Sequence, residues 1–248
     1  MRPAPKVQQN ATSAEGLKSE DIENCLVDLN SKLGNFNPKR RDPAKLVLLG
    51  GALAVRQLKT GERTHNIDVL LDPRAEDWHL GQIRQCMAQA GRHFRELDRP
   101  TEQPGRAGAQ NRLFGSDELR AAVYGSALSG KCVYKGDHLE VYAMNTAHAF
   151  EVELRRMEGR AGACAGLGDA VAILEALTEG GKRPRSRNAC RDLQHVRRGA
   201  PISYGCIRKV ETHFYKRYGK QGIVNTEWFD PVWKYQDMHG RWVAFPGN

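Results

Sequence analysis

The sequence has no apolar run near the roughly 20 residues that a membrane span needs, so it predicts no membrane contact. Its six cysteines form no CxxC pair and no Cys/His cluster at zinc spacing, which argues against a zinc site. The first 16 residues, MRPAPKVQQNATSAEG, have no apolar centre and do not resemble a secretory signal. These absences predict a cytoplasmic protein with reduced thiols.

Acidic residues are in deficit. The chain carries 38 Lys and Arg against 29 Asp and Glu, which gives a net charge of +9 and a pI of about 9.4. An uneven basic surface favours a polyanion, and in the cytosol this is most often RNA; a solvated basic face is the alternative. The residues expected to bind tRNA form two clusters, Lys39, Arg40 and Arg41 in the first and Lys182, Arg183, Arg185 and Arg187 in the second.

The most informative stretch is 46–72, LVLLGGALAVRQLKTGERTHNIDVLLD. It predicts a strand, a Gly-Gly turn at Gly50 and Gly51, a short helix, a loop and a second strand that carries Asp68. Glycines after a strand let backbone N–H groups approach a phosphate closely. A carboxylate inside an apolar strand is costly unless it is paired or functional, so Asp68 is a candidate site residue.

This stretch resembles the signature of the nucleotidyltransferase superfamily related to DNA polymerase beta, in its small stand-alone form. The residues that carry the resemblance are Gly50, Gly51, Arg63, Thr64, Asn66 and Asp68. The family's first metal-binding Asp falls on Asn66, and only the second, Asp68, is kept. Because Mg²⁺ is held mainly by carboxylates and phosphates, we expect no metal and no other cofactor.

The resemblance continues downstream. The segment GDHLEVYAMNTAHAFEVELRRM is similar to the family's third strand and following helix, with Glu140 at the place of the third carboxylate and Asp137 as a second candidate. Glu140 alternates with Leu139 and Val141, so it could also lie on the solvent face of a strand. The segment GLGDAVAILEAL is similar to the next helix of the family and has Asp169 near its start.

The patterns predict an α/β (α+β) fold, which the resemblance makes a nucleotidyltransferase-like mixed sheet flanked by helices. We expect a disordered tail over 1–18, the core over 19–158, and a helical C-terminal part with a basic linker over 159–248. Helices are predicted over 21–33, 76–97, 118–128, 146–157, 167–177, 190–198 and 204–218, and strands over 46–49, 67–71, 131–134 and 138–143.

The last 25 residues are rich in aromatic side chains. We predict that they form a hydrophobic clasp over the core; stacking on nucleic-acid bases, beside Lys234 and Arg241, is the alternative. The residues concerned are Trp228, Phe229, Trp233, Tyr235 and Trp242.

Three classes of function remain open: a nucleotidyltransferase, a transferase on the same scaffold without nucleotide chemistry, and an RNA- or protein-binding module. The chain's size, basic character and incomplete motif are similar to the fungal arginine-containing cyclodipeptide synthases. That resemblance implies an enzyme that joins amino acids from aminoacyl-tRNAs into an arginine-containing cyclic dipeptide. The expected catalytic residues are Asp68, Glu140 and Asn66, and the expected substrate-binding residues are Gly50, Gly51, Arg63, Thr64 and Asp137.

Overall fold

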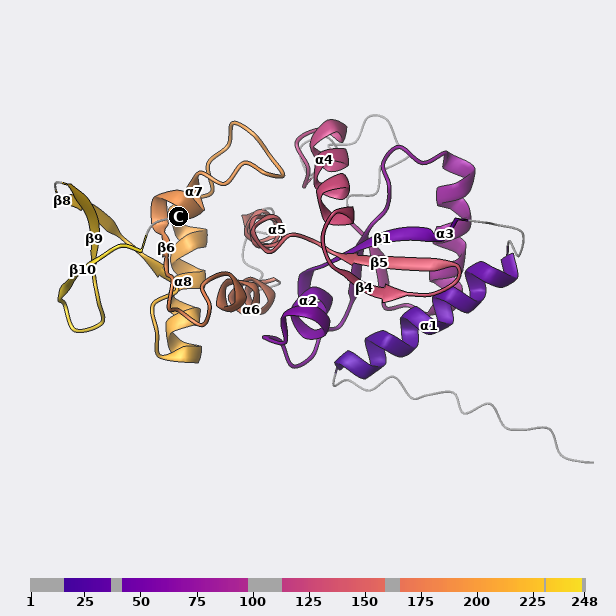
Figure 1. Cartoon of the computed structure of the whole chain (residues 1–248), viewed down its shortest axis with the longest axis horizontal. Helices are drawn as coiled ribbons and strands as arrows, with labels where there is room; N and C mark the ends of the chain where they lie inside the picture. Colours follow the sequence, from indigo (N-terminus) through magenta and orange to yellow (C-terminus); the bar gives the residue numbers. More distant parts are fainter. Residues whose placement is uncertain (1–15, 37–41, 98–112, 159–165, 230, 247–248) are drawn as a thin grey trace, which may run out of the picture.

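The computed structural model describes residues 16–36, 42–97, 113–158, 166–229 and 231–246. Its centre is a mixed five-stranded sheet in the order β3-β2-β1-β5-β4 (Figure 1). In the middle, β1 pairs antiparallel with β2 and parallel with β5. The predicted α+β class is therefore confirmed. The strands are β1 (Ala44–Leu49), β2 (Ile67–Leu70), β3 (Phe94–Glu96), β4 (Cys132–Lys135) and β5 (Leu139–Ala143).

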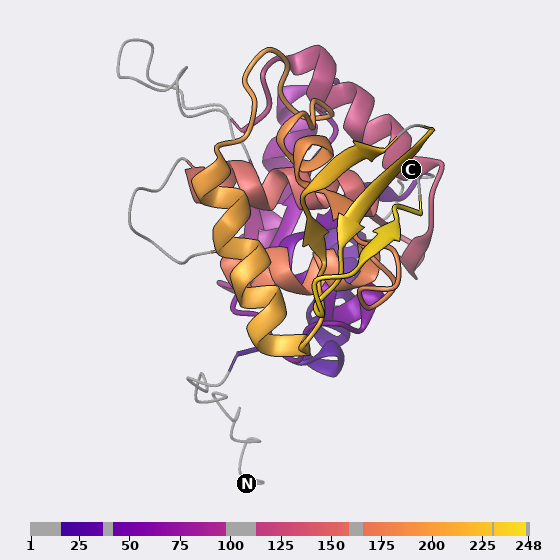
Figure 2. The same ribbon diagram turned by 90° about the vertical axis from the view of Figure 1, so that its left-hand side faces the viewer.

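Helices pack against this sheet, and further helices continue the fold into the C-terminal part. α1 packs against α3, and α4 contacts β1 and β5. α2, α5 and α6 gather where β1 and β5 end, and α8 packs against α5 and α6 (Figures 1 and 2). The helices are α1 (Ser19–Phe36), α2 (Gly50–Leu53), the π-helical turn η1 (Ala54–Leu58), α3 (Asp77–Ala90), α4 (Asp117–Leu128), α5 (Thr146–Glu158), α6 (Leu167–Leu177), α7 (Arg187–Arg191) and α8 (Tyr204–Tyr218).

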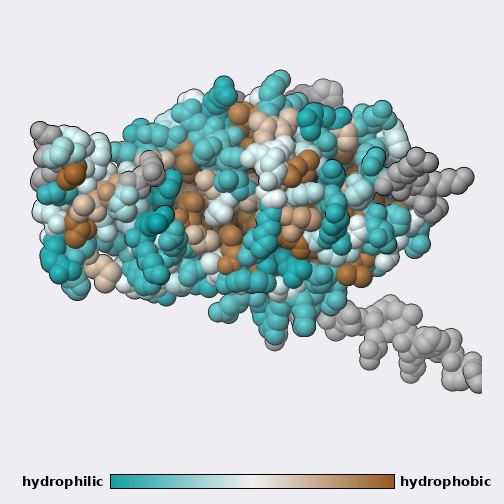
Figure 3. Space-filling view, in the orientation of Figure 1, coloured by the Kyte–Doolittle hydropathy of each residue, from teal (hydrophilic) through white to brown (hydrophobic). Residues whose placement is uncertain are grey.

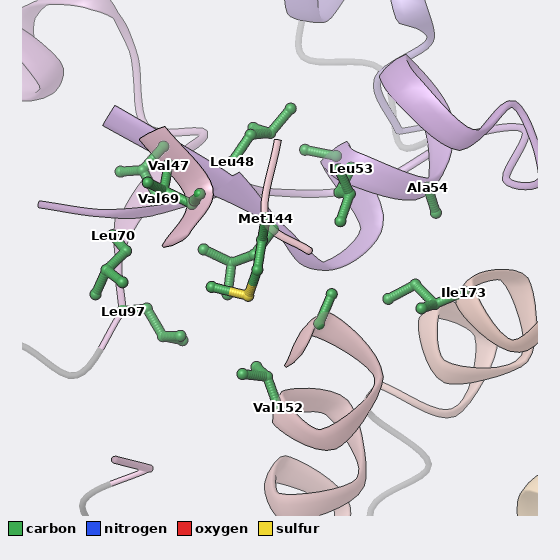
Figure 4. Close-up of a cluster of buried hydrophobic side chains, with 14 of the residues drawn as sticks. Val47, Leu48, Leu53, Ala54, Val69, Leu70, Leu97, Met144, Val152 and Ile173 are labelled. Carbon is green, nitrogen blue, oxygen red and sulfur yellow. The ribbon is translucent and has the colours of Figure 1, made fainter. Parts of the chain in front are cut away.

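One hydrophobic core runs from α1 through the sheet to α8. In α1 the apolar residues at helical spacing, Ile22, Leu26, Leu29 and Leu33, are all buried, as the sequence pattern predicts. Figure 4 shows the contact between the sheet and the helices at its end, where Met144 lies near Val152 of α5. The space-filling view shows hydrophilic side chains over much of the face that it presents, with hydrophobic residues between them (Figure 3).

Two helix predictions are too long. The helix predicted over 76–97 ends at Ala90, because Gly91 adopts φ 138° and the chain then forms β3, which pairs with β2. The helix predicted over 190–198 is reduced to α7, which ends at Arg191. Gly199 and Pro201 follow this segment, and residues 192–203 connect α7 to α8 without regular structure.

The C-terminal part ends in strands, so the prediction that it is helical holds only as far as α8. β6 (Arg185–Ser186) pairs with β7 (Ile223–Val224). A three-stranded antiparallel sheet follows, made of β8 (Thr226–Phe229), β9 (Val232–Gln236) and β10 (Trp242–Ala244). Figures 1 and 2 place this sheet beyond α8, at the far end of the molecule from α1.

The prediction that the C-terminal aromatics clasp the core is wrong. Trp228 and Trp233 are 54% and 48% exposed, and Trp242 is also exposed. The reason is that β8, β9 and β10 pair with one another in a separate sheet beyond α8, so these tryptophans are not packed against the core.

Two predicted segments lie partly or wholly outside the described residues. Of the predicted disordered tail, residues 1–15 lie outside the described residues, and Leu17 forms an antiparallel bridge with Thr64. The first basic cluster, Lys39 to Arg41, also lies outside them. Within the described ranges, no helix combines the length and the apolar character that crossing a membrane requires.

A buried acid anchors the connecting segment to α5. Glu151 is fully buried and accepts hydrogen bonds from the backbone N–H of His195 at 2.6 Å and of Val196 at 3.2 Å. It also pairs at 3.3 Å with Arg155, which donates to the carbonyl oxygen of Leu193 at 3.1 Å. This network holds an irregular segment against the helix through polar contacts.

We expect Glu151→Ala to lower the free energy of unfolding by about 3–5 kcal/mol, because it removes the buried partner of Arg155 and leaves two amides without their acceptor. Urea denaturation measures this loss. The control is Glu179→Ala, which removes the partner of Arg183 in an exposed ion pair and should cost less than about 1 kcal/mol. Equal losses in the two variants would contradict a buried anchor.

Candidate functional site

The Gly-Gly turn at the end of β1 is packed against acidic side chains. Gly50 has φ +63°, and a Cβ there would lie 2.9 Å from Asp68 Oδ2 and 3.3 Å from Glu153 Oε1. A Cβ on Gly51 would lie 2.7 Å from Asp169 Oδ1 and would overlap the Thr64 hydroxyl. Both positions therefore require glycine. The structure gives the two glycines a packing role; binding of a phosphate there stays a prediction.

Asp68 is the centre of a buried ion network. Its side chain is 4% exposed, and Arg95 of β3 donates to both of its oxygens at 2.5 and 2.8 Å. Arg156 of α5 donates to Asp68 at 2.8 Å and to the fully buried Glu153 at 2.8 Å. Two guanidinium groups thus compensate the buried carboxylate. Asp68 joins β2, β3 and α5, and its oxygens are engaged by protein donors.

Asp169 is the carboxylate of this region whose pKa is raised. It lies in the first turn of α6, half-buried, and accepts a hydrogen bond from the backbone N–H of Gly51. Burial, together with the nearby negative charge of Asp68, raises the pKa of Asp169 to about 6. A carboxylate with such a pKa can both take up and release a proton near neutral pH.

Asp169 lines a pocket of about 460 Å³. Its wall also contains Gly51, the charged residues Glu62, Arg63 and Arg217, and small apolar side chains such as Ala172. This volume lies in the range of small-molecule sites. The pocket therefore combines a proton acceptor, a second carboxylate and two cations.

The prediction that Glu140 and Asp68 share a site is wrong. Along β1, Asp68 is level with Leu49, whereas Glu140 is level with Lys45. Four residues of strand separate the two levels by about 13 Å. Glu140 is near the start of β5, at the end of the sheet remote from the Gly-Gly turn, where it accepts from the Tyr142 hydroxyl at 2.8 Å.

Asp137 is likewise outside the pocket, because it lies in the exposed turn between β4 and β5. Ala143, the last residue of β5, is the partner of Leu48, so the next residue, Met144, comes level with Leu49. Met144 is buried among apolar side chains (Figure 4). Strand β5 therefore brings no carboxylate level with Asp68. In the part of the chain that is described, no three His, Cys, Asp or Glu side chains are grouped to hold a metal ion.

The remaining predicted residues fall close to the turn. Thr64 is buried beside Gly51, and its hydroxyl donates to the carbonyl oxygen of Asn66 at 3.1 Å. Arg63 is exposed and lines the pocket. Asn66 is half-buried and is not among the lining residues. The structure thus brings Gly50, Gly51, Arg63, Thr64 and Asp68 together and leaves Glu140 and Asp137 apart.

The second basic cluster is divided by its ion pairs. Arg187 donates twice to Glu211, at 2.9 and 3.0 Å, and is half-buried. Arg183 pairs with Glu179 at 3.3 Å on the surface. Lys182 is exposed and Arg185 is half-buried. Contact of these side chains with tRNA stays a prediction.

No motif in the sequence assigns a role to Arg95, Glu153 or Arg156, and Asp169 stands out only through the family resemblance. Glu153 and Arg156 stand at helical i, i+3 spacing on α5, which would have suggested an ion pair. Arg95 lies in β3, a strand that falls inside the helix predicted over 76–97. Its position beside Asp68 was therefore not predicted.

No protein-family model matches the chain, and comparisons with curated proteins and with solved structures found no similar chain. The geometry described above therefore carries the functional argument.

We expect Gly51→Ala to destabilise the fold by about 1–3 kcal/mol, since the added methyl group would overlap Thr64 and Asp169. Thermal and urea unfolding measure the change. Gly168→Ala is the matched control, because a Cβ there meets nothing within 4 Å. An equally harmless Gly51→Ala would show that the turn is looser than described.

We expect Asp169→Asn to stabilise the protein at pH 8 by about 1–3 kcal/mol and to have little effect at pH 4. The folded pKa of Asp169, about 6, is above its ordinary value of 3.8. Its favourable contribution is therefore present below pH 4 and lost as the pH rises through 6. Urea titrations at both pH values test this, with Asp192→Asn, at an exposed position, expected to stay within about 0.5 kcal/mol. A pH-independent effect of Asp169→Asn would contradict the raised pKa.

Proposed function

We propose that the chain is a tRNA-dependent transferase that joins amino acids from aminoacyl-tRNAs into an arginine-containing cyclic dipeptide. The observation that carries this proposal is Asp169, a half-buried carboxylate with a pKa of about 6 at the wall of a pocket. The pocket has room for an aminoacyl group. It lies next to the strongly basic C-terminal part of the chain, from which Arg217 enters its wall.

The chemistry needs positioning and a base. An aminoacyl ester is already activated, so its carbonyl carbon can be attacked by the amino group of a second aminoacyl residue. The new N–C bond forms and the C–O bond to the ribose breaks. Asp169 takes the proton from the attacking nitrogen and passes it to the departing ribose oxygen, which leaves as a hydroxyl group. Repetition with the second ester closes the ring. The reaction requires no oxidant or reductant.

The charges of the pocket suit this substrate. Glu62 supplies a second carboxylate, which would pair with the guanidinium of the arginine. Arg63 and Arg217 would contact the terminal phosphates of the tRNA. Asp68 acts indirectly as a positioning residue: through Arg156 and the Gly50 turn it holds the backbone on which Asp169 rests.

The residues around Asp68 favour this function over metal-dependent nucleotidyl transfer. Asn66 stands where the resemblance expects a metal-binding Asp, Glu140 lies at the remote end of the sheet, and Asp68 is paired with two arginines. An RNA-binding module without activity remains the second candidate, because the net charge of +9 favours a polyanion whether or not a reaction follows.

We expect the purified protein, supplied with arginyl-tRNA and a mixture of other aminoacyl-tRNAs, to form a cyclic dipeptide detectable by mass spectrometry. Asp169→Asn should lower the rate by about 10²–10⁴ through loss of the base, with tRNA binding retained. Glu140→Gln, at the remote end of the sheet, should keep most of the activity. Formation of a nucleotidylated product instead, or of no product by the wild-type protein, would contradict the proposal.

A further inference from the structure

The β8–β10 sheet collects aromatic side chains on one of its sides. Trp228 and Trp233 are directly opposite in the register of β8 and β9, so they project from the same face. Their ring centroids lie 5.4 Å apart in an edge arrangement. Tyr235 continues the same face and packs edge-on against Phe245. These rings form an aromatic face, defined by Trp228, Trp233, Tyr235 and Phe245.

This face is left open to solvent. Trp228 and Trp233 are 54% and 48% exposed, although tryptophan is usually well buried in a single chain. Contiguous exposed apolar surface of this kind marks a binding site more often than a structural need. Phe214 and Val210 of α8 are buried against the core, so the core is complete without these tryptophans.

The neighbouring helix adds positive charge. Residues 182–220, which contain α7 and α8, hold twelve Lys and Arg against two acidic residues, Asp192 and Glu211. This segment alone accounts for the excess charge of the chain. Arg208, Lys209 and Lys216 of α8 are exposed and do not line the Asp169 pocket. A polyanion that approaches this end of the molecule therefore meets aromatic rings and cations together.

A groove of about 540 Å³ lies between α8 and the turn that follows β9. One wall is the face of α8 formed by Arg208, Glu211 and Tyr215, at helical spacing, and the other includes Asp237 and Met238 from the turn after β9. Tyr215 is 51% exposed and adds a further ring. The groove is open to solvent, so it suits an extended polymer better than a compact ligand.

We propose that the aromatic face and α8 bind a single-stranded segment of nucleic acid, with bases stacked on Trp228 and Trp233 and phosphates held by the cations of α8. Every base has a π-face, so such a platform accepts many sequences, whereas a duplex hides its bases in the stack. The occupant is inferred from this pairing of rings with positive charge. The proposal does not depend on the transfer reaction above, because the platform is separate from the Asp169 pocket.

The test uses the full chain and a fluorescently labelled 12-nucleotide single strand of mixed sequence, as RNA and as DNA, with the RNA duplex for comparison. Fluorescence anisotropy should show tighter binding of at least one single strand than of the duplex. Replacing Trp228 and Trp233 together with Ala should weaken that binding by at least about 30-fold, because two stacking rings are lost. Trp78→Ala, which removes an exposed tryptophan on α3, is the matched control and should have no effect.

Two further variants separate stacking from folding and from charge. Replacing Trp228 and Trp233 with Phe should keep most of the affinity but remove the quenching of tryptophan fluorescence that the oligonucleotide causes in the wild-type protein. Arg208→Ala should reduce the slope of log affinity against log salt by about 0.7, while Arg74→Ala, at an exposed arginine beside β2, should not.

Unchanged affinity in the double Ala variant would overturn the proposal, as would equal binding of duplex and single strand. Sedimentation equilibrium provides another decisive outcome, since loss of a dimer in the double Ala variant would show that the aromatic face binds a second copy of the chain. Product formation measured with the same variants at saturating aminoacyl-tRNA should be normal, so failure here is distinguishable from failure of the proposed reaction.

Discussion

The arrangement of the candidate site depends on the buried carboxylate of Asp68 and the two arginines that compensate it. An isolated charge at that depth would cost several kcal/mol, so Arg95 and Arg156 must stay close. Their positions fix β3 against β2 and α5 against the end of β1. Gly50 allows this approach because it has no side chain where the Asp68 and Glu153 oxygens lie. The glycine turn and the ion network are therefore a single structural unit.

This unit has a consequence for the pocket. The negative charge of Asp68 lies near Asp169, and together with burial it makes the ionised form of Asp169 costly. One carboxylate is thus paired and structural, and its neighbour titrates near neutral pH. Environments that push two neighbouring acids apart in pKa are the usual basis for assigning acid and base roles. Under the proposed function, Asp169 therefore takes the catalytic role that the sequence predicts for Asp68.

Much of the fold could be predicted from sequence, because local signals agree with the tertiary structure. The helix predicted over 204–218 coincides with α8, where Ser203 caps the start and Gly219 ends it. The strands around the Gly-Gly turn were also found, since their apolar runs are bounded by turn residues. The prediction failed at β3, and in the C-terminal strands, where pairing with a partner outweighs the local preference.

The site was harder to predict than the fold. Asp68 stands out because it is a charge in an apolar strand, but its partners are 27 and 88 residues away in the chain. Glu140 has the same local pattern and lies at the wrong level, because strand register, which sequence does not show, decides which acids meet. The raised pKa of Asp169 could not be predicted from sequence, because it depends on burial and on the nearby charge of Asp68.

The central claim is that Asp169 is a poised proton acceptor while Asp68 is a paired structural charge. The most direct measurement is an NMR titration of the side-chain carboxyl carbon of Asp169 in the folded protein. The structure predicts a midpoint near pH 6. A midpoint near the ordinary value of 3.8 for aspartate would contradict the claim, because Asp169 would then have no special affinity for the proton of an attacking amine.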